Sequence, residues 1–70
     1  MDNIKIQGDY IKLQDILKYS GLCMTGGHAK MAVQNGEVEL NGEVCTMRGK
    51  KVKDGDVIKY NNKEIKAVFV

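Results

Sequence analysis

Proline and tryptophan are absent from this 70-residue sequence, and its aromatic side chains are limited to three Tyr and one Phe. So few rings offer no obvious platform on which nucleic-acid bases could stack, and they predict a core of aliphatic side chains. Long hydrophobic runs are also missing: the longest is Ala67–Val70, far short of the roughly 20 residues of a membrane-spanning helix. The N-terminal residues lack the apolar segment of a secretory signal, so we expect a cytoplasmic protein with no membrane partner.

Cysteine and histidine are scarce as well, since Cys23, Cys45 and His28 are their only representatives. One His and two widely separated Cys do not make a zinc site, and free thiols are the default in the cytoplasm. Cys23 and His28 could lie near each other, but a nucleophile and its base also need a group that orients the base. The sequence offers no such group, and we expect no enzymatic activity, no catalytic residue, no metal and no cofactor.

The composition is that of one small folded domain spanning residues 1–70, with 43% hydrophobic and 29% charged residues. The net charge of +2 is too small to indicate nucleic-acid binding by itself. The charges are nevertheless separated along the chain: 48–53 holds four basic residues and no acidic one, whereas 37–43 holds three acidic residues and no basic one. Such separation can give a small protein one basic face despite a low total charge.

Two short helices are predicted by apolar residues spaced three and four apart, one over 12–19 and one over 26–34. Their core-facing stripes are Leu13, Ile16 and Leu17 in the first, and Ala29, Ala32 and Val33 in the second. Ser20-Gly21 ends the first helix, because a glycine adopts the left-handed C′ conformation without steric cost. Thr25 is a suitable N-cap for the second, with its hydroxyl placed to accept the N–H of His28.

The rest of the sequence predicts β-structure: strands over 4–6, 37–40, 43–46, 56–60 and 64–70. Asn41-Gly42 is a strong signal for a hairpin turn. A strict two-residue turn would pair Leu40 with Glu43 and turn Val44 away from the face of Leu40, so we expect a bulge or a longer loop there. The fold class is α+β, with two short helices packed on one side of a small, mostly antiparallel sheet.

The first candidate binding segment is the start of the second helix. Gly26 and Gly27 occupy its first two positions, although glycine is an unfavourable helix residue. Without Cβ atoms, the N–H groups of this turn could approach a phosphate closely, and the helix dipole favours an anion there. His28 and Lys30 would add donors or charge at the same end. Alternatively, the two glycines only ease a tight turn between the helices.

The second candidate is the basic segment 48–53, taken as a loop that presents several cations to a phosphate backbone. Alternatively, it is an ordinary solvated loop. Glu37, Glu39 and Glu43 are expected on the solvent face of the hairpin, where they would repel nucleic acid if they shared its side.

The order of these features resembles the S-four RNA-binding domain, or αL motif, over about residues 11–60. The segments that carry the resemblance are Lys12-Leu13, Thr25 with Ala29-Lys30, Gly36–Gly42 (Gly-Glu-Val-Glu-Leu-Asn-Gly), Arg48–Lys51 and Gly55–Ile58 (Gly-Asp-Val-Ile). Leu17–Gly21 and Gly27–Lys30 further resemble the small stand-alone members, the YbcJ/YaaA-like group. Many members of the wider family have Arg directly after the capping residue, where this chain has Gly26, as the stand-alone group tends to have.

The resemblance implies RNA binding without catalysis, through the two helices, the hairpin and the basic loop. The positions that it carries over are Lys12, Thr25, Gly26, Gly27, Lys30, Arg48, Lys50 and Lys51. We expect a monomeric, ribosome-associated protein that contacts structured RNA, either ribosomal RNA or a tRNA-like fold, with ribosomal proteins as further partners. The low net charge and the acidic hairpin keep an alternative open: a protein-interaction module in ribosome assembly that makes no direct RNA contact.

Overall fold

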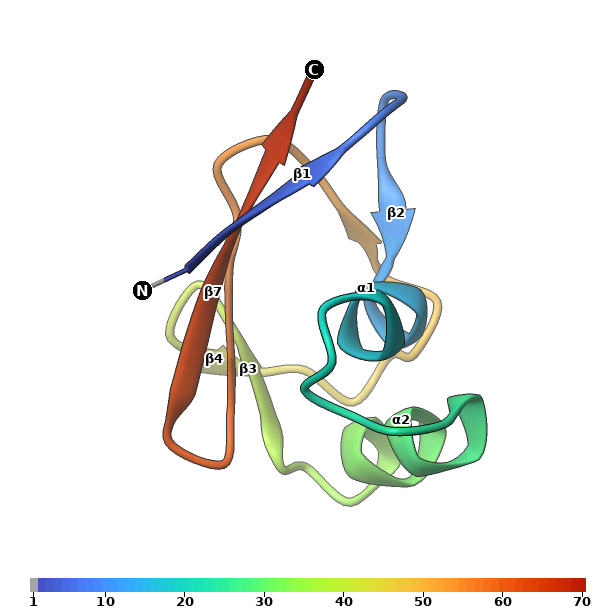
Figure 1. Cartoon of the computed structure of the whole chain (residues 1–70). Helices are drawn as coiled ribbons and strands as arrows, with labels where there is room; N and C mark the ends of the chain where they lie inside the picture. The colour runs from blue at the N-terminus through green and yellow to red at the C-terminus, as the bar shows by residue number, and fades with distance from the viewer. Residues whose placement is uncertain (1) are drawn as a thin grey trace.

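Two layers make up the computed structural model, which describes residues 2–70 (Figure 1). One layer is a five-stranded sheet and the other holds two helices, with a two-stranded ribbon beside the helices. The sheet contains, in spatial order, β1 (Asp2–Ile6), β7 (Lys63–Phe69), β6 (Val57–Tyr60), β3 (Val38–Leu40) and β4 (Glu43–Val44). Only β1 and β7 are parallel, so the expected α+β fold with a mostly antiparallel sheet is confirmed.

Both helices form where the apolar spacing predicts them, as α1 (Leu13–Tyr19) and α2 (Gly26–Gln34). The hydroxyl oxygen of Thr25 accepts the N–H of His28 at 3.0 Å, which confirms the N-cap. Gly21 has a φ of +84° and ends α1 as expected. The bond that closes this turn comes from the N–H of Cys23 to the carbonyl of Leu17, at 2.9 Å. Neither helix in residues 2–70 has the length and apolar character needed to cross a bilayer.

The expectation of a bulge or a longer loop in the β3–β4 hairpin is wrong, because the turn is a strict two-residue one. Leu40 pairs with Glu43, and Asn41 and Gly42 both have positive φ (+53° and +86°), as a type I′ turn requires. We expected Val44 to face inward, but it is 60% exposed. Val44 makes no contribution to the core, because β4 is a two-residue edge strand and the apolar contacts of the hairpin come from β3. Residues 45–46, expected in the strand, lie outside it.

A two-stranded ribbon was not predicted. Ile11–Lys12 forms β2 and Lys51–Val52 forms β5, and the two strands pair antiparallel. The description of 48–53 as a loop is therefore wrong for Lys51 and Val52. Ile11 and Val52 pair across the ribbon and pack on the core, Val52 completely buried. Because side chains alternate along a strand, the neighbouring lysines point to solvent.

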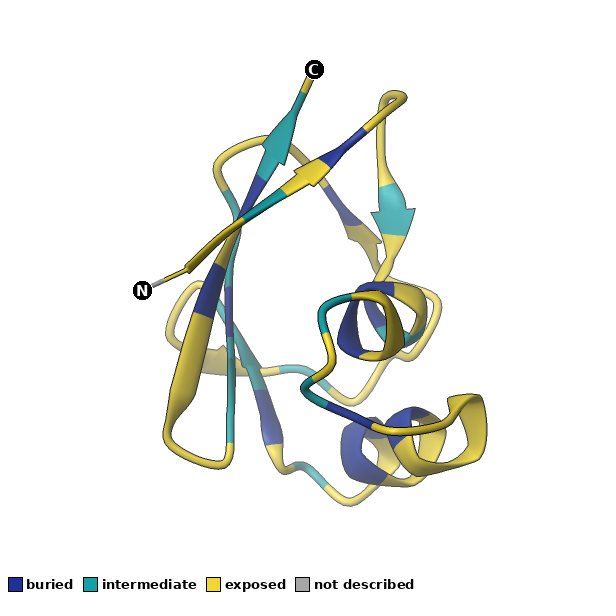
Figure 2. Cartoon of the chain, in the orientation of Figure 1, coloured by how far each residue is buried: buried dark blue, intermediate teal, exposed yellow. Residues whose placement is uncertain are grey.

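The core lies between the helices and the sheet, and every fully or nearly fully buried side chain in the described part of the chain is aliphatic apart from one cysteine (Figure 2). Its members are Ile6, Leu13, Ile16, Leu17, Cys23, Ala29, Ala32, Val33, Val38, Val52, Ile58, Ile65 and Ala67. This confirms the aliphatic core and both helical stripes. Three connecting segments, at residues 7–10, 45–50 and 53–56, join the ribbon to the sheet.

The Gly-Asp-Val-Ile segment has a structural function that the sequence does not reveal. One carboxylate oxygen of Asp56 accepts the side-chain amide of Asn41 at 3.0 Å, and the other accepts the N–H of Lys53 at 2.8 Å. The side-chain oxygen of Asn41 in turn accepts the N–H of Val57 at 2.9 Å. Asp56 therefore fastens the end of the basic segment to the hairpin turn.

Candidate nucleic-acid interface

Four of the predicted site residues converge on the ribbon and the loop that enters it. We call Lys12, Arg48, Lys50 and Lys51, all of them exposed, the basic ribbon. Lys12 and Lys51 are directly opposite each other in the β2–β5 pairing, an arrangement of like charges that destabilises a strand pair. Lys12 is also the N-cap residue of α1, where the helix dipole disfavours a cation. An anion bound here would relieve both costs.

The backbone of the basic ribbon is fixed by α1. The carbonyl of Lys50 accepts the N–H of Leu13 at 2.9 Å, and the carbonyl of Arg48 accepts the N–H of Gln14 at 3.0 Å. These two bonds satisfy amides that a helix N-terminus otherwise leaves without partners. The first turn of α1 is therefore closed to a phosphate, while the basic side chains stand on a rigid backbone.

The start of α2 is an exposed surface formed by Thr25, Gly26 and Gly27. Neither glycine has a positive φ, and a Cβ on Gly26 would meet no atom within 4 Å. A Cβ on Gly27 would meet only the Thr25 hydroxyl oxygen, at an ordinary contact distance of 3.9 Å. The fold thus has no steric need for glycine here, which weakens the explanation that the two residues only ease a tight turn.

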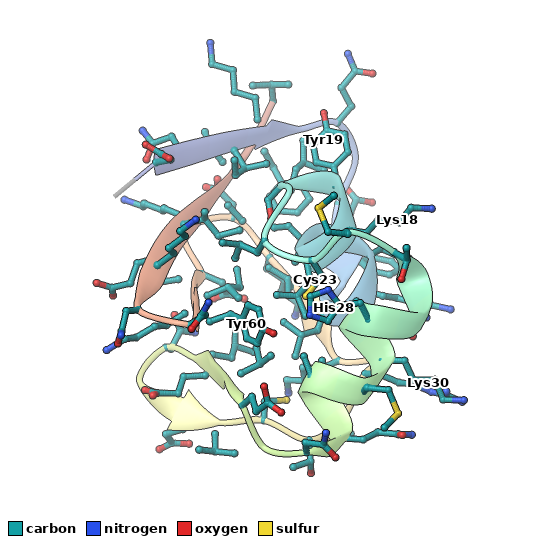
Figure 3. The ribbon with its side chains drawn as sticks, turned by 60° about the horizontal axis from the view of Figure 1, so that its bottom comes forward. Lys18, Tyr19, Cys23, His28, Lys30 and Tyr60 are labelled. Atoms are coloured by element: carbon teal, nitrogen blue, oxygen red, sulfur yellow. The ribbon has the colours of Figure 1, made fainter. Side chains whose placement is uncertain are left out.

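His28 and Lys30 do not share a face of α2. The ring of His28 points toward Tyr60 of β6, while Lys30 projects to the opposite side (Figure 3). Nδ1 of His28 accepts the N–H of Met24 at 3.3 Å, so in the neutral ring Nε2 carries the proton and donates to the Tyr60 hydroxyl, 3.0 Å away. Residues two apart on a helix point in nearly opposite directions. His28 therefore ties the start of α2 to the sheet.

Cys23 lies close to His28 (Figure 3) and is 1% exposed. Burial raises the pKa of the Cys23 thiol, and the nearby charge of Glu37 raises it further. Burial also raises the pKa of Tyr60, with Cys23 and Glu37 as smaller causes. The thiol is therefore protonated at neutral pH, and both ring nitrogens of His28 are already occupied, so the geometry contains no Cys–His nucleophile.

The raised pKa of Cys23 predicts a loss of stability at alkaline pH. The folded state holds this proton more tightly than an unfolded thiol of ordinary pKa 9.0, so the free energy of unfolding should fall as pH rises above that value. Urea denaturation at pH 7, 9 and 10 measures the slope. Cys23→Ala should make the slope between pH 9 and 10 shallower; an unchanged slope would assign the loss to other groups.

Two residues near these surfaces were not predicted as site residues. Lys18 of α1 projects to the same side as Lys30 in the view of Figure 3. Tyr10, just before β2, has the ammonium of Lys51 4.8 Å from its ring centroid. Tyr10 could have been found from the alternation of outward and inward side chains at 10–12. That alternation is meaningful only once 11–12 is known to be a strand.

An acidic side chain bounds the basic ribbon on the hairpin side. Glu43 and Lys50 line the same groove, together with Val44 and Met47, which are largely exposed. Glu37 and Glu43 are exposed as expected, and Glu39 is half-buried. Cys23 and Cys45 are both free thiols, and residues 2–70 contain no group of three or more metal-ligating side chains.

Residues 4–68 match the family model of the S4 domain. The putative RNA-binding protein YbcJ of Escherichia coli (strain K12) is 29% identical over 59 residues, 84% of each chain, and an uncharacterized YbcJ of Shigella flexneri matches equally well. The solution structure of Escherichia coli YbcJ, described as revealing an αL motif involved in RNA-binding, superposes with a TM-score of 0.75 at 26% identity, over 97% of this chain and 87% of YbcJ. The 30S ribosomal protein S4e of Thermoplasma acidophilum shares the fold, with a TM-score of 0.58 at 24% identity, over 80% of this chain and 29% of S4e.

Proposed function

Because the chain belongs to the S4 domain family, we propose that it is a single, non-catalytic RNA-binding domain that holds structured RNA through its phosphates. The related YbcJ protein of Escherichia coli is named as a putative RNA-binding protein, and its αL motif is described as involved in RNA-binding. The class of RNA that we propose is ribosomal RNA or a tRNA-like fold. In the ribosomal case, ribosomal proteins would be its neighbours.

The observation that carries this proposal is the opposition of Lys12 and Lys51 across the ribbon. A pairing that costs stability suggests a use for the paired charges, since proteins violate local rules mainly at functional sites. Arg48 and Lys50 extend the same positive surface from a backbone that α1 holds in place. A phosphate backbone supplies the negative charge that such a surface favours.

The start of α2 would provide the second contact. The N–H groups of Gly26 and Gly27 are covered by no side chain of their own, and Lys30 and Lys18 could contact neighbouring phosphates. A-form RNA hides its base edges in a deep, narrow major groove but exposes its phosphates and 2′-hydroxyls. With about four to six phosphates contacted, the logarithm of affinity should fall with the logarithm of salt at a slope of roughly −3 to −5.

Binding to total ribosomal RNA and to a random duplex, measured across a salt series, tests the proposal. Tight and steeply salt-dependent binding that favours ribosomal RNA is the expected result. Weak binding to both RNAs, or binding that salt leaves unchanged, would contradict it.

A variant at the start of α2 should separate stability from binding. Gly26→Ala places a better helix former where a Cβ meets nothing, so it should stabilise the fold by about 0.5 kcal/mol. The same methyl group would stand in front of the free amides and should weaken RNA binding severalfold. Thermal denaturation and RNA titration measure the two effects. Gln34→Ala, an exposed change at the other end of α2, is the control and should leave RNA affinity unchanged. RNA affinity unchanged in Gly26→Ala would exclude the start of α2 from the interface.

A second candidate function, a protein-interaction module without RNA contact, is favoured by one observation. Val44 and Met47 are largely exposed beside the groove on the hairpin, where a protein partner could cover them. Recovery of a bound protein after nuclease treatment, combined with failure to bind ribosomal RNA, would favour this function over the first.

A further inference from the structure

We propose that Tyr10 stacks on one unpaired base of the bound RNA, so that the protein selects a duplex interrupted by a bulge or ending in an unpaired nucleotide. This inference rests on the proposed RNA-binding function and adds the class of RNA structure that the surface selects. It starts from a residue to which neither the sequence patterns nor the family resemblance assigns a role.

Tyr10 lies on the solvent face of the basic ribbon. Ile11 pairs with the buried Val52 and turns inward, so the residues on either side of it, Tyr10 and Lys12, turn outward. Lys51 faces Lys12 across the ribbon and reaches the Tyr10 ring diagonally, with its ammonium 4.8 Å from the ring centroid. One aromatic ring is thus set among the cations of the basic ribbon.

The contact with Lys51 prepares the ring for stacking. A cation within about 6 Å of an aromatic centroid is attracted to the ring face, which restricts the ring before any ligand arrives. Tyr10 is still 45% exposed, so a second flat group has access to it. A base and the phosphates on either side of it would meet the aromatic surface and the lysines together, which matches the chemistry of an unpaired nucleotide.

Continuous duplex cannot use this surface, because the faces of its bases are covered by their stacked neighbours. In structured RNA, the bases that stack on aromatic side chains come from bulges, loops and ends. A single aromatic ring can stack on only one base, so the proposal requires one unpaired nucleotide and no further aromatic residues. The cations around Tyr10 would then hold the flanking duplex phosphates.

The experiment compares two RNA hairpins with the same stem, one fully paired and one with a single bulged 2-aminopurine. Stacking of one base on an aromatic ring corresponds to about a tenfold gain in affinity, and it quenches the fluorescence of 2-aminopurine. We therefore expect the natural protein to bind the bulged hairpin about tenfold more tightly, with quenching. Tyr10→Phe should keep both effects, whereas Tyr10→Leu should lose both and keep its affinity for the paired hairpin.

Tyr19→Leu is the matched control, because Tyr19 is even more exposed (65%) but its hydroxyl lies against the Lys5 carbonyl of β1. It should behave like the natural protein, and thermal denaturation confirms that each variant is folded. Equal affinity for the two hairpins, or a preference that survives Tyr10→Leu, would overturn the inference. If both hairpins still bind and lose affinity when the basic ribbon is changed, the proposed function stands alone; if neither hairpin binds the natural protein, both proposals fail.

Discussion

Replacing Arg48, Lys50 and Lys51 together by Ala should weaken RNA binding about 100-fold near 0.15 M salt and make the salt slope shallower by about 2 to 3. Each of these side chains is exposed and can neutralise one phosphate. The loss should be similar for RNAs of different sequence, because phosphate contacts carry no direct sequence information. Titration of one RNA at several salt concentrations measures both the affinity and the slope.

The fold should survive this triple change. Arg48 and Lys50 support α1 through their main-chain carbonyls, which alanine retains. Lys5→Ala, Lys63→Ala and Lys66→Ala together remove the same charge from exposed positions of β1 and β7, and they form the matched control. Equal losses in the two triple variants would show that only total charge matters, and no loss in the first would exclude the basic ribbon from the interface.

Leu13→Ala should cost about 2–5 kcal/mol of stability, because it removes a fully buried side chain and leaves a cavity between α1 and the rest of the core. Native proteins are stable by only about 5–15 kcal/mol, and small domains lie at the low end of this range, so the variant should unfold far below the melting temperature of the natural protein. Urea denaturation gives the free energy of unfolding directly.

The adjacent Lys12→Ala provides the control for Leu13→Ala. Lys12 is exposed and opposed to Lys51, so its removal should leave the free energy of unfolding unchanged or raise it by up to about 1 kcal/mol. It should nevertheless weaken RNA binding. A Lys12→Ala variant that is strongly destabilised would mean that this lysine supports the fold, and our explanation of the opposed charges would be wrong.

The helices could be predicted from the sequence because their signals are local. The spacing of Leu13, Ile16 and Leu17, the Thr25 cap and the Gly21 stop each act within one or two helical turns. The hairpin was predicted for the same reason, since Asn41-Gly42 forms its turn without help from the rest of the chain. The error about Val44 came from assuming that an apolar residue in a strand must be buried.

The ribbon and the parallel edge of the sheet could not be predicted in this way. The strands at 11–12 and 51–52 are two residues long, too short for any periodicity, and they pair across about 40 residues of sequence. The parallel pairing of β1 with β7 joins the two ends of the sequence and has no local signal. Both strand pairings are set by tertiary structure, because they depend on which apolar surfaces pack against each other.

For the candidate site too, local sequence signals predicted some residues, whereas others depend on tertiary pairing. Lys12, Arg48, Lys50 and Lys51 were selected from sequence, but only the ribbon explains why Lys12 lies beside the other three. Tyr10 was missed because its value depends on Lys51, 41 positions further along the chain. The direction of His28 was missed because its partner, Tyr60, lies on a distant strand. A sequence indicates which side chains are available, whereas pairing decides which of them become neighbours.

The parallel pair of β1 and β7 has a consequence for how the chain acquires its fold during synthesis. Asp2–Ile6 is synthesised before the strand beside which it lies, Lys63–Phe69, and residues 7–62 lie between the two. β1 must therefore wait until β7 has been synthesised, and such long-range closure is slow compared with helix formation. The contacts of α1 with α2 and with β2, and the pairing of β2 with β5, all lie within residues 11–52. We therefore expect these elements to associate before the sheet is complete, whereas the bond of His28 to Tyr60 forms only once β6 is present.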